Sequence, residues 1–185
     1  MSTEHAREHA REHAGEHAED YDRLRRRLLW SMPGGIYVVG SRAGEQRNLM
    51  TTSWAIQVAT EPKLVMVSVE VAAVTHRLVA DGGVFSLCTI AREDRAIVRK
   101  FVKPVAEGPP HDGVATLNGF PVTEATTGAP ILVQAVGWLD CRVRQALEAG
   151  SSHTCFVGEV VAAGFNRDEE TPVLRMEDTR MSYGG

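Results

Sequence analysis

The order of apolar and polar positions predicts a chain made mostly of β-strands. Short segments rich in β-branched residues recur along it, either continuously apolar or alternating, and Gly, Pro, Asp and Ser clusters separate them. We therefore expect strands at 36–39, 51–60, 63–69, 84–89, 131–147 and 153–165, and a last short strand that begins at 172. Residues 148–152 contain Gly150 and two serines, which favours a hairpin between the two longest strands.

Helical spacing is confined to a few segments. The helices expected from this spacing cover 21–31, 71–80 and 92–102. Loops are expected at 40–44 and at 103–113, where Gly and Pro gather around His111. Many strands, few helices and no regular alternation of the two predict an antiparallel barrel, and the long strand at 131–147 suits barrel closure.

Residues 1–20 differ in composition from the rest of the 185-residue chain. They contain a Glu-His-Ala repeat that places His5, His9, His13 and His17 four residues apart, and two such histidines on a helix can chelate a divalent metal. We interpret this segment as a solvated, partly helical tail and assign no metal site, because the repeat alone supplies no third ligand of fixed geometry. The predicted globular domain is 21–185.

Charge and cysteine usage exclude several classes of function. A net charge of -4 argues against nucleic acid as a partner, and no apolar run reaches the length of a membrane span. The N-terminus is polar and unlike a signal peptide. Cys88, Cys141 and Cys155 have no metal-like spacing, which predicts buried free thiols and a cytoplasmic protein.

Hydroxyl side chains gather at two places that together suit a flavin mononucleotide. Thr51, Thr52 and Ser53 lie on one predicted strand, where a flat ring with polar edges could lie beside them. Thr75 stands at the start of a predicted helix, where free backbone amides attract a phosphate. The neighbouring side chains add apolar walls, from Met50 and Trp54, and a positive charge, from Arg77.

Four motifs in this order carry a resemblance to a known family. They are Thr-Thr-Ser-Trp at 51–54, Glu-Pro-Lys-Leu-Val-Met-Val-Ser-Val at 61–69, Thr-His-Arg-Leu at 75–78 and His-Thr-Cys-Phe-Val-Gly-Glu-Val at 153–160. Together with the apolar segment that follows Pro33, they resemble the flavin reductase-like family of FMN-binding split β-barrels. The resemblance covers roughly residues 29–164.

The resemblance implies a mainly β, antiparallel split β-barrel with a few short helices and an N-terminal helical extension. It also implies a homodimer that binds FMN at or near the subunit interface, with the flavin ring beside 51–54 and a nicotinamide near His153, the candidate catalytic residue. The residues that it assigns to the ribityl chain, the phosphate and the lining of the site are Ser68, Val69 and Glu70, then Thr75, His76 and Arg77, then Phe101 and Lys103.

The expected activity is that of an NAD(P)H-dependent FMN reductase, which passes a hydride from NADH or NADPH to flavin N5 and can supply reduced flavin to a partner oxygenase. Ser151 and Ser152 precede His153 where such proteins often carry Gly-Asp, and this departure concerns nicotinamide handling. Two alternatives stay open: an FMN-binding electron carrier without reductase activity, and a barrel that uses heme or the deazaflavin F420. A structural role for His153 also stays open.

Overall fold

The computed structural model describes residues 18–179, so the histidine repeat at 5–17 and the C-terminal segment 180–185 lie outside the described residues. The chain divides into two units. One is Gly34–Thr179, and the other contains a helix over 18–30. This helix confirms the prediction for 21–31, with an earlier start. An ion pair between Arg25 and Asp22 at 2.7 Å links neighbouring turns on its surface.

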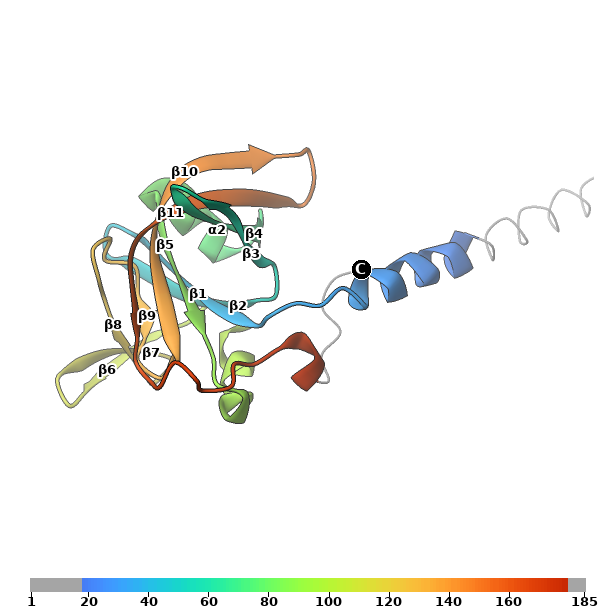
Figure 1. The fold of residues 1–185 in the computed structure, drawn as a ribbon. Helices are drawn as coiled ribbons and strands as arrows, with labels where there is room; N and C mark the ends of the chain where they lie inside the picture. The colour runs from blue at the N-terminus through green and yellow to red at the C-terminus, as the bar shows by residue number, and fades with distance from the viewer. Residues whose placement is uncertain (1–17, 180–185) are drawn as a thin grey trace, which may run out of the picture. The chain divides into compact units, whose positions relative to one another are not determined.

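Two antiparallel sheets form the unit Gly34–Thr179, which confirms the predicted fold class (Figure 1). The larger sheet has the spatial order β2-β1-β5-β10-β11-β4-β3, with β1 Tyr37–Ala43, β2 Gln46–Thr52, β3 Ala55–Thr60, β4 Lys63–Glu70, β5 Val84–Thr89, β10 Gly137–Glu148 and β11 His153–Phe165. The smaller sheet has the order β6-β7-β8-β9, with β6 Glu107–His111, β7 Val114–Leu117, β8 Phe120–Thr123 and β9 Ile131–Leu132.

The larger sheet is rolled because its two edge strands are joined by a very short link. Strands β2 and β3 lie at opposite edges, and only Ser53 and Trp54 connect them. A flat sheet of this width would separate its edges by about 29 Å, whereas this link spans at most about 11 Å. The edges must therefore meet at Ser53–Trp54 without pairing, which makes the barrel split along this seam.

The helices that accompany the barrel are short. Helix α2, Val74–Gly82, ends at Gly83, whose φ of 67° is the left-handed conformation that suits glycine. The predicted helix over 92–102 is wrong: two 3₁₀ turns stand there instead. All 3₁₀ turns of the described residues are η1 Arg92–Asp94, η2 Ile97–Phe101 and η3 Met176–Asp178.

Strand β5 and strand β11 have the predicted bounds, but one predicted strand breaks in two at the seam. A continuous strand over 51–60 is wrong, because the Thr52 hydroxyl accepts a hydrogen bond from the Trp54 backbone amide at 3.1 Å. This local bond replaces a ladder bond and turns the chain. The same turn ends β2, which forms a hairpin with β1 through Gly44 and Glu45 in the segment predicted as a loop.

Three further boundaries differ from the predictions. The predicted strand over 131–147 divides into β9, in the smaller sheet, and β10, in the larger one. The predicted loop at 103–113 contains β6. The predicted last strand from 172 is reduced to isolated bridges, from Val173 to Ala91 and from Arg175 to Gly35. In each case the pairing partner, and not the local apolar pattern, decides where a strand starts and stops.

The core lies inside the rolled sheet and is closed at one end by α2. Its buried side chains are Val39, Val65, Val67, Val69, Val79, Phe85, Leu87, Cys141 and Phe156. Burial raises the pKa of Cys88 to about 11 and that of Cys141 to about 12, so both thiols stay neutral and act as packing residues. Cys155 is free and half-buried.

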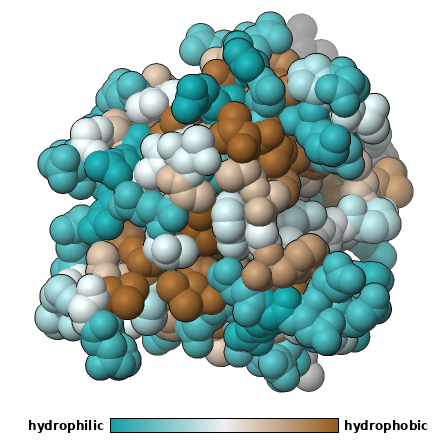
Figure 2. Space-filling model, turned by 60° about the vertical axis from the view of Figure 1, so that its left-hand side comes forward, coloured by the Kyte–Doolittle hydropathy of each residue, from teal (hydrophilic) through white to brown (hydrophobic). Residues whose placement is uncertain are grey.

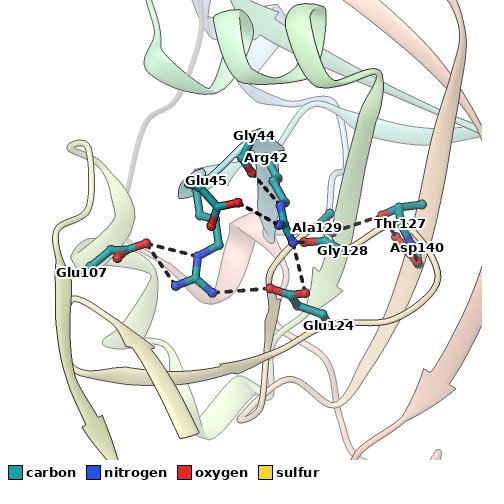
Figure 3. Close-up of polar contacts among 10 residues, drawn as sticks. Arg42, Gly44, Glu45, Glu107, Glu124, Thr127, Gly128, Ala129 and Asp140 are labelled. Atoms are coloured by element: carbon teal, nitrogen blue, oxygen red, sulfur yellow. Dashed lines mark hydrogen bonds and ion pairs between the residues drawn. The ribbon is translucent and has the colours of Figure 1, made fainter.

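Loop 124–130, between β8 and β9, is fixed to two strands of the larger sheet (Figure 3). Arg42 on β1 pairs with Glu124 at 3.2 Å. On the other side, the buried carboxylate of Asp140 on β10 accepts hydrogen bonds from the Thr127 backbone amide, at 2.8 Å, and from the Thr127 hydroxyl. The loop therefore lies directly over β1. Because it joins β8 and β9, its attachment also positions the smaller sheet against the larger one.

Gly40 on β1 is where this loop passes closest to the sheet. An added Cβ would lie 1.9 Å from the Pro130 carbonyl oxygen and 2.4 Å from the Ser86 hydroxyl. We expect Gly40→Ala to lower the free energy of unfolding by about 3 kcal/mol in urea denaturation, because backbone must move. Gly34→Ala is the control: its nearest neighbour is 3.7 Å away. Equal stability of both variants would contradict this close approach.

Candidate functional site at the barrel seam

Trp54 and His153 meet at the seam of the barrel. Their ring centroids lie 4.7 Å apart with an interplanar angle of 66°, an edge-on contact. The Trp54 side chain is 41% exposed, so its ring also offers a flat apolar surface to a ligand. The Ser152 hydroxyl lies 2.9 Å from His153 Nδ1, which leaves Nε2 as the ring nitrogen available to a bound molecule.

The strand register explains why these residues come together. Trp54 accepts a backbone hydrogen bond from Ser68 at 2.9 Å, and His153 is paired with Glu70 across β4 and β11. Side chains two residues apart on a strand share a face, so Ser68 and Glu70 stand beside Trp54 and His153 on the outer face of the sheet. Four of the predicted site residues therefore form one cluster.

The N-terminus of α2 lies next to the start of β11, as Figure 1 shows. The Val71 amide donates to the Ser152 carbonyl at 2.9 Å, and His76 Nε2 lies 2.9 Å from the Thr154 hydroxyl. The N-cap residue, Ala73, makes no side-chain capping bond. The His76 amide bonds to the Ala73 carbonyl at 3.1 Å, so the amides that no cap side chain occupies are those of Val74 and Thr75, at the positive end of the helix.

Thr75 points into the protein and not toward solvent. Its side chain is buried, and its hydroxyl accepts a hydrogen bond from the side-chain amide of Asn48 at 2.8 Å. Asn48 also accepts a bond from the Val105 amide at 2.9 Å. Gln46, two residues before Asn48 on the same strand, accepts a hydrogen bond from the Arg77 guanidinium through its side-chain oxygen at 2.8 Å. Strand β2 therefore holds the first turn of α2 through two amide side chains.

Sequence reasoning missed Asn48 and Gln46. The signal that could have found them is the alternation of Gln46, Asn48 and Met50 along one face of β2, which is visible only once a strand over 46–52 is recognised. A buried side-chain amide needs partners for both its nitrogen and its oxygen, and Asn48 finds them in Thr75 and Val105.

Two predicted ring contacts are engaged within the protein. The Thr51 hydroxyl is buried and donates to the Val98 carbonyl at 2.6 Å, while the Thr52 hydroxyl holds the turn at the seam. Met50 is half-buried against the core, and Ser53 is half-buried at the seam itself. Of the predicted 51–54 stretch, Ser53 and Trp54 are thus the residues best placed to contact a ligand through their side chains.

Three other predicted residues are spread between core and surface. Val69 and Phe101 have no exposed side-chain surface, and Phe101 packs edge-on against Phe120 at 5.3 Å between ring centroids. Lys103 is exposed, and it lies two residues before Val105, whose amide is bonded to Asn48. The positive charge of Lys103 therefore lies in a segment that is bonded to β2, the strand that also bonds to α2.

A cleft of about 650 Å³ opens beside the seam, lined by Ala55 and Ile56 of β3 and by residues of β1, β4, β5, β10 and β11. Its aromatic walls are Tyr37, Trp138 and Phe165. Hydrophobic side chains also reach the surface elsewhere, and the face in Figure 2 shows them in patches among hydrophilic ones. The volume lies within the range of small-molecule sites.

Within residues 18–179, no three His, Cys, Asp or Glu side chains are grouped as a metal ion requires. The same part of the chain contains no helix with the length and apolarity needed to cross a membrane.

Comparison with known proteins gives one family and several relatives. The family model for the flavin reductase like domain matches residues 29–184. The structure is similar to that of the NADH:FAD oxidoreductase SgcE6 of Streptomyces globisporus C-1027, with 26% identity, a TM-score of 0.69, and coverage of 85% of this chain and 88% of that one.

It is also similar to an FMN-binding protein of Thermus thermophilus with bound p-hydroxybenzaldehyde, with 26% identity, a TM-score of 0.62, and coverage of 76% and 75%. Among curated proteins, a putative diflavin flavoprotein A 2 of Synechocystis sp. is 27% identical over 72% of this chain. The match spans only 22% of that longer protein. The names of these similar proteins thus include both forms of flavin, FAD and FMN.

The bond between Asn48 and Thr75 predicts a stability effect. Replacing Thr75 with Val removes the acceptor and leaves a buried amide unpaired, so we expect the free energy of unfolding to fall by about 1–3 kcal/mol. Thr75→Ser keeps the hydroxyl and should retain most of the stability. Urea titration followed by tryptophan fluorescence measures both, and a Val variant more stable than the Ser variant would contradict the assigned bond.

Proposed function

Because this chain belongs to the flavin reductase like domain family, we propose that it is an NAD(P)H-dependent FMN reductase. The observation that carries this proposal is the exposed Trp54–His153 pair beside the first turn of α2. It combines an apolar wall for a ring, an acid–base group and an anion site on one surface. A bound flavin supplies the hydride-accepting ring atom, and the protein supplies binding and orientation.

The donor set at the seam fits the parts of a flavin mononucleotide. Trp54 offers an apolar wall, and Ser68 and Glu70 offer polar groups along the outer face where a ribityl chain could run. The uncapped first turn of α2, with Arg77 on its exposed side, suits a phosphate. Lys103 can add a second positive charge at this end of the site.

His153 is the proposed acid–base residue of the reaction. The hydrogen bond with Ser152 and the edge contact with Trp54 restrict the imidazole to one orientation, with Nε2 toward the ligand side. Hydride transfer from a reduced nicotinamide adds negative charge to the acceptor, and one proton must follow. His153 would hold this proton at Nε2, donate it toward the bound ligand and regain a proton from solvent.

The first test uses absorbance of the purified protein with FMN or FAD, followed by NADH or NADPH without oxygen. Bleaching of the flavin bands at a catalytic rate is expected, and the four combinations report the preferred flavin and nicotinamide. Flavin bands that persist would overturn the reductase proposal and favour the FMN-binding electron carrier. Heme bands, or the spectrum of F420, would show that the barrel uses that cofactor in place of FMN.

We expect His153→Ala to lower kcat by about 100-fold while the dissociation constant for FMN changes little, because the histidine acts in proton transfer. Stopped-flow reduction by NADH measures the rate, and fluorescence titration measures the affinity. His111→Ala is the matched control, since His111 is exposed at the end of β6. Wild-type turnover in the His153 variant would assign this residue a structural role.

The proposal includes a homodimer formed through the outer face of β3, β4 and β11. Ile56, Met66 and Val157 are in register across these three strands, and Ile56 is 61% exposed. This apolar row lies next to the row that contains Trp54 and Ser68. A second copy covering it would bury apolar surface and would place the flavin at the subunit interface.

We expect Ile56→Glu to convert the dimer into monomer, because a buried unpaired charge is costly at an interface. Sedimentation equilibrium measures the mass, and an FMN titration should show weaker binding in the same variant. Val114→Glu is the control: Val114 is 39% exposed on β7 of the smaller sheet. A dimer that persists in Ile56→Glu would exclude this face as the interface.

Reduced flavin released by the reaction can serve an oxygenase component, which completes the proposal. The free thiols favour a cytoplasmic location for such a reductase, and the cytoplasm also supplies the reduced nicotinamide. Transfer is tested by separating the protein from an oxygenase with a dialysis membrane. Formation of the oxygenase product indicates that reduced flavin diffuses between the two proteins, and absence of product indicates that it does not.

A further inference from the structure

Among residues 18–179, Asn48 is the one buried side chain that bonds both to α2 and to the segment that carries Lys103. It is 4% exposed on β2. Its amide nitrogen donates to the Thr75 hydroxyl at 2.8 Å, and its carbonyl oxygen accepts from the Val105 amide at 2.9 Å. One planar group thus spans the first turn of α2 and the chain after η2.

The direction of the first bond determines what Thr75 can do. Because the Asn48 nitrogen can only donate, Thr75 must accept through its oxygen, and its own proton stays available as a donor. The hydroxyl itself is buried, so the bond acts on the position of the first turn, whose Val74 and Thr75 amides lie at the positive end of the helix.

The second bond places a positive charge. Lys103 precedes Val105 by two residues, with Pro104 between them. The fixed φ of a proline limits how far this short stretch can move once the Val105 amide is anchored. The Asn48 side chain therefore fixes the distance between the N-terminus of α2 and the segment that carries Lys103, and both of these are electropositive.

Resting on the flavin-binding function proposed above, we infer that Asn48 is the positioning residue of the phosphate subsite. It makes no contact with the ligand. It fixes the first turn of α2 through the buried Thr75 hydroxyl and holds the Lys103 segment, so that α2 and this segment converge on the phosphate of FMN. A preorganised anion site binds more tightly because its groups need not be ordered on binding.

Asn48→Asp tests this inference with the smallest change of shape. Aspartate keeps an acceptor for Val105 but removes the donor to Thr75, whose proton then turns toward the carboxylate. The new charge also repels a phosphate. We expect FMN affinity to fall by about tenfold or more, whereas riboflavin, which lacks the phosphate, should bind within about twofold of wild type.

Asn118→Asp is the matched control. Asn118 donates to the Lys100 carbonyl at 2.9 Å and accepts from the Ala106 amide at 3.0 Å, so it anchors the same stretch of chain without touching α2. We expect it to leave the ratio of FMN to riboflavin affinity unchanged. Flavin fluorescence quenching at constant ionic strength measures both affinities for all proteins.

A second measurement does not depend on a folded variant. In the wild-type protein, the side-chain amide resonances of Asn48 should shift in a ¹⁵N-correlated spectrum when FMN is added, and should stay in place with riboflavin. If Asn48→Asp does not fold, the uncharged Asn48→Ser replaces it, with the same expected loss of preference for FMN.

The outcomes separate this inference from the function on which it rests. A wild-type protein that binds neither FMN nor riboflavin overturns the proposed function. Equal wild-type affinity for both ligands overturns the phosphate subsite. An Asn48 variant that retains the wild-type preference for FMN, or loses affinity for both ligands equally, overturns the positioning role alone.

Discussion

The two-residue link between β2 and β3 is the constraint on which the rest of the barrel depends. Because these strands occupy opposite edges of the larger sheet, Ser53 and Trp54 force the sheet to roll until its edges meet. Rolling encloses the apolar faces of the strands, and helix α2 covers one end of the barrel. It also leaves an unpaired seam, and the exposed ring of Trp54 stands at that seam against His153.

Polar groups inside the barrel hold this arrangement in one register. The Thr52 hydroxyl makes the turn at the seam, Asn48 holds α2, and Asp140 holds the loop at Thr127. Each is buried, so each would cost free energy if it lost its partner. The same bonds that stabilise the fold therefore also position the residues of the candidate site.

Prediction from the sequence succeeded where turn residues mark the start of a strand: Gly82 and Gly83 precede β5, and residues 150–152 precede β11. Strands β5 and β11 have the predicted bounds, and the hairpin before His153 is present. It failed at 51–60 and 131–147, where apolar periodicity continues across a break. In the candidate site, Trp54 and Glu70 both lie beside His153, whereas the hydroxyls of Thr51 and Thr75 face inward.

Local pattern and motif order were sufficient for the fold class and the family, because periodicity and turn chemistry are properties of neighbouring residues. The roll of the sheet, the face on which each hydroxyl lies and the role of Asn48 came only from the folded chain. These features depend on which strands pair and in which register, and a shift of one residue moves every side chain to the opposite face.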